Sequence, residues 1–248
     1  MTVVFVHGLP ETSEVWRPLR EVLQRETVAV ALPGFGAPRP HGFTGSKDAY
    51  AEWLGGTLRQ FDGPIDVVGH DLGGLLTMRV ASTFDVPLRS WVADVPEIFH
   101  PRSTWPERVQ QLQKPGIGEE MLRITREAAV DDPRGTTSRL MGAGVPRDLA
   151  TAMGAAHDEA MSRSILDFYR SAVPNVAADW WGDVTGPTPS RGLVLLLPDP
   201  PEVQAMSTEV ANRLGAETAS LGDLNHCWMA EAPQAVKPVL ERFWSSLE

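Results

Sequence analysis

One short segment of the chain combines an apolar run with a carboxylate flanked by glycines. Residues 65–74 read Ile-Asp-Val-Val-Gly-His-Asp-Leu-Gly-Gly, so Asp71 stands between Gly69 and Gly73. Glycines there let a strand and a following helix approach closely, while the residue between them is held in a strained turn. Because an aspartate with a pKa near ~3.9 is ionised at neutral pH, it can attack carbon without an activating base. The pattern predicts a nucleophile, and the alternative is a Gly-rich turn with a solvated Asp71.

A nucleophilic carboxylate needs a second group that releases the product. Attack on an epoxide or a halide leaves an alkyl ester on Asp71, which water must then cleave. His226, in Leu224-Asn225-His226-Cys227, is the candidate base, because neutral imidazole with a pKa near ~6.5 can take a proton from water. His7 and His70 lie inside turn motifs and are expected to support backbone. The remaining histidines are expected at the surface: His41, His100 and His157.

Apolar runs alternate with helical patterns along the chain. Continuous apolar strands with helices between them favour a parallel sheet covered on both faces. We predict strands at residues 3–6, 28–32, 65–68, 91–95, 193–197 and about 217–221, with helices from Thr12 or Ser13 through Leu23, at 47–61, from the glycine turn through Thr83, at 207–214 and at 233–247.

The segment from 99 to 176 differs from the rest of the chain. It has no strand-like runs and is rich in helix formers interrupted by Pro and Gly. We therefore predict an inserted helical cap at 99–176, with an α/β core made of residues 1–98 and 177–248.

Composition excludes several classes of function. The 248 residues carry a net charge of -10, so nucleic acid or an anionic membrane is not an expected partner. A single cysteine, Cys227, offers neither a disulfide nor a thiolate cluster for a metal. The sequence starts without a basic leader, and its longest aliphatic run, Leu193 to Leu197, is far too short for a membrane span. A cytoplasmic protein acting on a small neutral molecule is expected; its oligomeric state is not predicted.

Four motifs in order give the chain a family resemblance. His7-Gly8-Leu9-Pro10, Pro33-Gly34-Phe35-Gly36, the Gly-His-Asp-Leu-Gly-Gly turn and Asn225-His226 resemble the α/β-hydrolase superfamily. The aspartate in the turn is similar to the branch with epoxide hydrolases and haloalkane dehalogenases. This resemblance implies an α/β-hydrolase fold with an inserted cap and a catalytic triad. Members usually begin with two further strands, so a sheet trimmed of those strands is expected.

The resemblance also implies the remaining catalytic groups. The acid that orients His226 is expected after the strand at 193–197, where Asp199 matches by position, or after the strand at 91–95, where Asp94 is the alternative. Backbone N–H groups of Leu9 and Leu72 are expected to form an oxyanion hole. Dehalogenases of this kind have side chains at these two positions that donate hydrogen bonds to the halide. Leucine side chains cannot donate such a bond.

An epoxide needs a proton for its departing oxygen, and a tyrosine hydroxyl can supply one. Tyr169, in Leu166-Asp167-Phe168-Tyr169-Arg170, resembles the cap tyrosine motif of epoxide hydrolases, although a second cap tyrosine is missing. We therefore expect hydrolysis of an apolar epoxide to a vicinal diol, with water as co-substrate and without metal or cofactor. The alternatives are a haloalkane or haloacid dehalogenase, an ester or lactone hydrolase, and a non-catalytic ligand-binding protein on the same fold.

Overall fold

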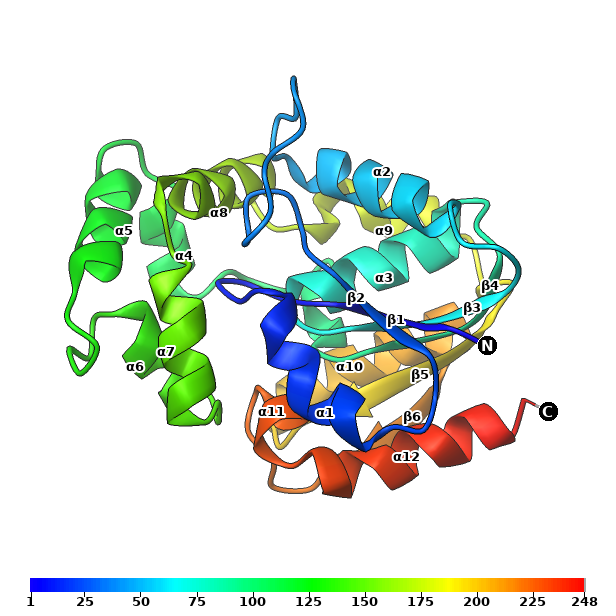
Figure 1. The fold of residues 1–248 in the computed structure, drawn as a ribbon. Helices are drawn as coiled ribbons and strands as arrows, with labels where there is room; N and C mark the ends of the chain where they lie inside the picture. The colour runs from blue at the N-terminus through cyan, green and yellow to red at the C-terminus, as the bar shows by residue number, and fades with distance from the viewer. Residues whose placement is uncertain (248) are drawn as a thin grey trace.

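A parallel β-sheet forms the centre of the computed structural model, which describes residues 1–247 (Figure 1). Every neighbouring pair of strands in this six-stranded sheet is parallel. This confirms the predicted α/β-hydrolase architecture. The strands, in their order across the sheet, are β2 (Thr27–Val30), β1 (Val3–Val6), β3 (Ile65–Gly69), β4 (Leu88–Ala93), β5 (Arg191–Leu196) and β6 (Glu217–Ser220).

Helices connect and cover these strands. Those of the α/β framework are α1 (Arg17–Val22), α2 (Lys47–Leu58), α3 (Leu72–Thr83), α10 (Pro201–Leu214), α11 (Trp228–Glu231) and α12 (Pro233–Ser245), with 3-10 turns η1 (Ser13–Trp16) and η2 (Pro96–Phe99). Between β4 and β5 come α4 (Glu107–Leu112), α5 (Ile117–Glu127), α6 (Thr136–Gly142), α7 (Arg147–Ala155), α8 (Glu159–Ser171) and α9 (Ala177–Asp183). No helix among residues 1–247 is long and apolar enough to cross a membrane.

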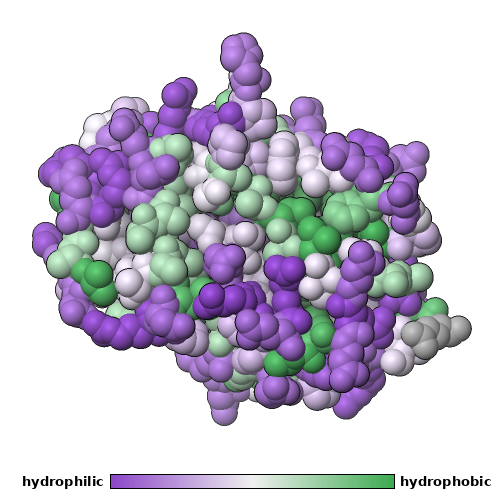
Figure 2. Space-filling model, viewed as in Figure 1, coloured by the Kyte–Doolittle hydropathy of each residue, from purple (hydrophilic) through white to green (hydrophobic). Residues whose placement is uncertain are grey.

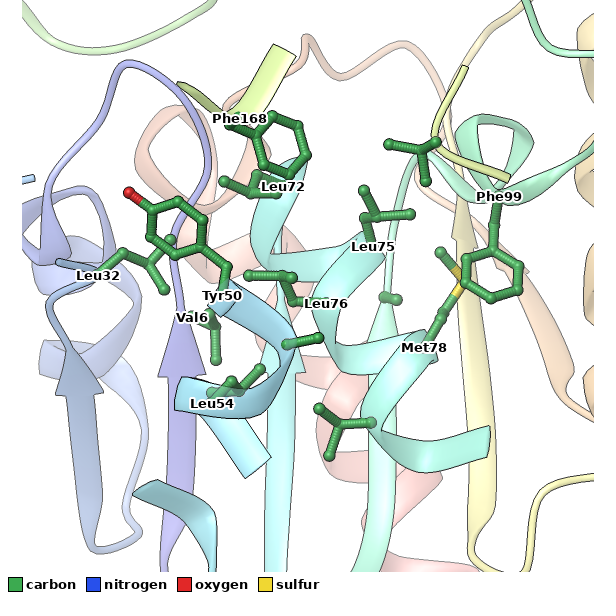
Figure 3. Close-up of a cluster of buried hydrophobic side chains, with 14 of the residues drawn as sticks. Val6, Leu32, Tyr50, Leu54, Leu72, Leu75, Leu76, Met78, Phe99 and Phe168 are labelled. Atoms are coloured by element: carbon green, nitrogen blue, oxygen red, sulfur yellow. The ribbon is translucent and has the colours of Figure 1, made fainter. Parts of the chain in front are cut away.

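The alternation of side chains along each strand produces a core on both faces of the sheet. In β1, Val4 and Val6 pack with residues of α2 and α3, whereas Val3 and Phe5 pack with those of α1 and α12. Figure 3 shows the first of these clusters, with Leu72 and Leu76 of α3 on the side of Tyr50 and Leu54 of α2, and Leu75 towards Phe99. A strand buried on both faces shows no polar alternation, which is why these segments are continuous apolar runs.

The helices α4 to α7 form a group beside one end of the sheet, while α8 lies near α2 (Figure 1). Their placement agrees with an inserted helical segment, and the division of the chain at 98/99 and 176/177 stays a prediction. On the surface facing the viewer in Figure 2, hydrophilic side chains surround small apolar patches.

The strand at residues 3–6 is observed as predicted, and the ends of the other strands differ from the sequence-based prediction by at most three residues. Strand β4 ends at Ala93, so Asp94 and Val95 leave the sheet instead of continuing it. Val95 adopts φ 50°, a left-handed conformation that a β-branched residue rarely takes. This turn directs η2 across the carboxyl end of the strands, where Asp94 meets the turn after β3.

Candidate active site

Asp71 occupies a strained turn between β3 and α3. Its backbone has φ 51° and ψ −119°, a conformation that costs a non-glycine residue ~1–3 kcal/mol. The flanking glycines allow the close approach that holds it there. A Cβ on Gly69 would lie 2.2 Å from the Gly73 oxygen, and one on Gly73 would lie 2.1 Å from the Val6 oxygen. The turn therefore lifts the Asp71 side chain off the end of the sheet.

Three groups fix the Asp71 carboxylate and its backbone. Oδ1 accepts a hydrogen bond from the Leu9 N–H at 3.0 Å, and Oδ2 lies 3.6 Å from Nε2 of His226. The backbone N–H of Asp71 donates to Oδ1 of Asp94 at 2.8 Å. Burial favours the protonated acid, but the hydrogen bond and charge of His226, the charge of His70 and the Leu9 N–H outweigh it and hold the Asp71 pKa below its usual range. The carboxylate is therefore ionised at neutral pH.

The two predicted oxyanion-hole residues differ in their contacts. The Leu9 N–H contacts the carboxylate directly. Leu72 is the first residue of α3 and is 2% exposed. Within residues 1–247, the carboxylate receives no hydrogen bond from the Leu72 N–H.

A row of buried charged groups lies behind the nucleophile. His70 Nδ1 is 2.5 Å from Oδ2 of Asp94, and its Nε2 is 3.0 Å from Oε1 of Glu11. The Trp228 indole N–H donates to the same Asp94 oxygen at 2.6 Å. Although burial lowers the pKa of His70, the two carboxylates raise it well above its usual value. His70 is thus an imidazolium held between Asp94 and Glu11.

The same row contains the one group of metal-type ligand atoms identified among residues 1–247. The donor atoms of Glu11, His70 and Cys227 lie within 4.8 Å of one another. Both His70 nitrogens, however, face carboxylates, and a protonated imidazole has no lone pair for a metal. The Cys227 thiol has its pKa raised to about 12 by burial and by the charge of Glu11. These residues fit an internal ion pair better than a metal ligand set.

His226 lies at the edge of this row and faces the site. Its side chain is 38% exposed, and its ring centroid is 4.5 Å from that of His70. Burial and the positive charge of His70 lower its pKa, while the hydrogen bond and charge of Asp71 raise it, and the net shift is upward. The protonation of His226 therefore depends on the charge of Asp71.

Neither candidate orienting acid is hydrogen-bonded to His226 within the described chain. The oxygens of Asp94 are engaged by His70, Trp228 and the Asp71 N–H. Asp199 lines the same cavity as Asp71. The orienting role of Asp199 thus stays a prediction.

Two neighbouring cavities share Tyr169 and Val109 in their linings. One is lined by Asp71, Glu97 and Asp199, and the other by Leu9 and residues of the helices between β4 and β5. Burial and the negative charge of Asp71 raise the pKa of the Tyr169 phenol. Across residues 1–247, its hydroxyl finds no hydrogen-bond partner, so it is a free donor at the junction.

Glu97 is an acid of the site that sequence reasoning missed. Burial and the nearby charges of Asp199 and Asp94 raise its pKa from 4.5 to about 7. Between pH 4.5 and 7 the folded chain holds a proton that the unfolded chain releases, so this group makes stability fall as pH rises through that window.

We expect Glu97→Gln to remove that loss. The variant should be roughly 1–3 kcal/mol more stable than the original chain at pH 8 and nearly unchanged at pH 4. Urea unfolding at several pH values measures the difference, with Glu202→Gln as a control on the exposed start of α10. A pH-independent difference would show that Glu97 does not titrate with a raised pKa.

Three histidines lie in places that the sequence-based interpretation got wrong. His70, expected to support backbone, contacts two carboxylates. His100 and His157, expected at the surface, are only 3% and 4% exposed. His100 Nε2 meets Glu209, and His157 lies between Thr136 and Ser162. Their sequence neighbours gave no sign of this, because Glu209 and Thr136 are far from His100 and His157 in the sequence.

Comparison with known proteins gives the family. The family model described as "Alpha/beta hydrolase family" matches residues 3–239. A search of curated protein sequences gave no match. Among solved structures, a candidate epoxide hydrolase from Pseudomonas aeruginosa is 23% identical with a TM-score of 0.76, and the match covers 99% of this chain and 89% of that one.

Two further structures have the same fold. A loop variant of a haloalkane dehalogenase from Bradyrhizobium elkanii is 16% identical with a TM-score of 0.72, over 99% of this chain and 89% of that one. MenH from S. aureus is 14% identical with a TM-score of 0.70, over 100% and 94%. The family model spans nearly the whole sequence. The chain is therefore a hydrolase that belongs to the alpha/beta hydrolase family.

Proposed function

We propose that the protein hydrolyses epoxides to vicinal diols through a covalent ester on Asp71. The arrangement of three groups carries this proposal. Asp71 is an ionised carboxylate on a strained turn, His226 lies 3.6 Å from its Oδ2, and Tyr169 lines the same cavity with a free hydroxyl. Together they supply a nucleophile, a base for ester hydrolysis and an acid for the ring oxygen.

The first step forms the ester and opens the ring. Because Oδ1 is held by the Leu9 N–H, Oδ2, which lies 3.6 Å from Nε2 of His226, is the oxygen that attacks carbon. The carbon–oxygen bond of the epoxide breaks as the Asp71 bond forms, and the departing oxygen takes its proton from Tyr169. The Leu9 N–H then contacts the carbonyl oxygen of the new ester.

The second step cleaves the ester, and loss of the Asp71 charge prepares the base for it. Once Asp71 is esterified, His226 no longer faces a carboxylate, while burial and the charge of His70 still lower its pKa. The neutral ring takes a proton from water, and the hydroxide attacks the ester carbonyl. The diol leaves, Asp71 regains a carboxylate containing one oxygen from water, and the proton on His226 returns to the Tyr169 phenolate through solvent.

We expect His226→Gln to separate the two steps. The variant should form the ester and fail to hydrolyse it, because no base activates water. Incubation with styrene oxide and intact-protein mass spectrometry should show one added substrate mass, and peptide mapping should place it on Asp71. His41→Gln, a change of an exposed histidine, should show no adduct. The absence of any adduct across a broad epoxide panel would contradict the proposal.

We also expect Tyr169→Phe to distinguish an epoxide from a halide as the electrophile. Loss of the proton donor should lower the rate of epoxide opening by about 10²–10⁴-fold. Halide displacement needs no such proton and should change less than about threefold. The burst of ester formation with styrene oxide and halide release from 1-bromobutane measure the two rates. Equal losses on both substrates would assign Tyr169 a packing role.

A further inference from the structure

The second cavity beside Tyr169 contains two arginines in an otherwise largely apolar lining. Arg108 comes from α4 and Arg139 from α6, and both line this cavity with Leu9, Tyr169 and Ile165. Figure 1 shows the helices α4, α5, α6 and α8 grouped around this end of the molecule. Tyr169 and Val109 line both cavities, so the cavity with the arginines lies directly beside the cavity that contains Asp71.

Neither guanidinium is neutralised by the described part of the chain. Arg108 donates to the Thr125 hydroxyl at 3.3 Å, and Arg139 donates to the Arg134 carbonyl at 3.1 Å. Neither forms an ion pair within residues 1–247. On the outer side of α5, by contrast, Arg123 pairs with Glu120 and Glu127.

The two positive charges also repel one another. Burial and the charge of Arg139 lower the pKa of Arg108. The two other titratable lining groups do not compensate: burial holds the pKa of His157 at about 4 and raises the pKa of Tyr169, so both are neutral at pH 7. Partly buried charges of the same sign without a partner are unfavourable unless a ligand supplies the opposite charge.

The cavity on the other side of Tyr169 has the opposite character. Asp71, Glu97 and Asp199 all line it, with Arg102 paired to Glu209. An anion there would face carboxylates. One cavity is therefore lined by carboxylates and the other by arginines. A substrate with a negative group is favoured in the orientation that places this group beside the arginines.

We propose that the natural substrate carries an anionic group, which binds Arg108 and Arg139 while the electrophilic carbon faces Asp71. This inference rests on the proposed function for its electrophile, but the anion site can be tested without turnover. Guanidinium groups bind carboxylate and phosphate with two parallel hydrogen bonds, so either headgroup suits the pair. The substrate class is thus narrowed from an apolar epoxide to an epoxide that bears an acid.

Binding of unreactive probes tests the anion site separately from catalysis. Phenylacetate, phenyl phosphate, phenylacetamide and 2-phenylethylammonium share an aromatic ring and differ in charge, and calorimetric titration gives a Kd for each. We expect the better of the two anions to bind at least about tenfold more tightly than the amide and the ammonium. The comparison of phenylacetate with phenyl phosphate identifies the preferred headgroup.

Arginine variants assign the effect to the cavity. Arg108→Gln and Arg139→Gln should each weaken anion binding by about tenfold and leave amide binding unchanged, whereas Arg108→Lys should retain part of the affinity. Arg123→Gln, which removes an exposed paired arginine, is the matched control, and circular dichroism confirms folding. Tightest binding of the ammonium, or equal losses for anion and amide, would overturn the inference. Failure of the His226→Gln trap with intact anion binding would overturn the reaction but not the anion site.

Discussion

Replacing Asp71 with asparagine should abolish turnover and ester formation together. We expect kcat/KM for styrene oxide to fall by at least about 10⁴-fold, because the amide is a poor nucleophile. The fold should persist, since asparagine keeps an oxygen that accepts the Leu9 N–H. Diol formation and intact-protein mass spectrometry measure both effects, with Asp71→Ala as a variant that cannot revert to aspartate.

The same substitution should change the charge of His226. Without the carboxylate, burial and His70 both lower the pKa of His226, so NMR titration should show a fall relative to the original chain. Asp62→Asn alters an exposed aspartate and should change neither quantity. Single turnover of the original chain in water enriched with ¹⁸O should label Asp71, because hydroxide attacks the ester carbonyl. Label found only in the diol would indicate direct attack by water and contradict the ester mechanism.

The fold could be predicted because its local and global signals agree. The strand at residues 3–6 is buried on both faces, so its sequence is uniformly apolar and could be assigned from composition. Gly69 and Gly73 marked the turn, because a side chain at either position would collide with backbone. The position of Asp71 could be predicted from the same two glycines, because a residue between them has to leave the sheet.

The buried row behind Asp71 could not be predicted in the same way. Glu11, His70 and Asp94 come from three separate turns, and only the parallel order β1-β3-β4 brings these turns together. Glu11 follows a Pro in what resembles an ordinary capping segment, so its sequence suggests a solvated acid. The strained backbone of Val95, which sets the direction of η2, has no sequence signature because valine disfavours it.

His70 and His226 therefore have different roles in the site. His70 keeps its proton because two carboxylates enclose it, whereas His226 has one carboxylate partner that the proposed reaction removes. The sequence motifs distinguish His226 from His70, but they do not show that His70 is charged. Their difference lies in how many acids surround each ring.

The charge of His70 should be essential to the stability of the chain. We expect His70→Gln to lower the free energy of unfolding by about 3–5 kcal/mol near pH 6, because it leaves Glu11 and Asp94 buried without a cation. Urea unfolding measures the change. His41→Gln should alter stability by less than about 0.5 kcal/mol. The double variant Glu11→Gln/His70→Gln should lose less than the sum of the two single variants, because Glu11 is then no longer a buried carboxylate without a cation and no longer repels Asp94.

The stability lost in His70→Gln should depend on pH. The pKa of His70 is raised above its usual 6.5, so its contribution is full below pH 6.5 and declines as the unfolded chain loses its proton above that value. The pKa of Glu11 is lowered from 4.5, despite burial, by the charge and hydrogen bond of His70, so its contribution is full above pH 4.5 and declines below it. The stability difference between the original chain and His70→Gln should therefore be largest between pH 4.5 and 6.5. A difference that rises up to pH 6.5 and stays constant above it would mean that His70 is neutral in the folded chain.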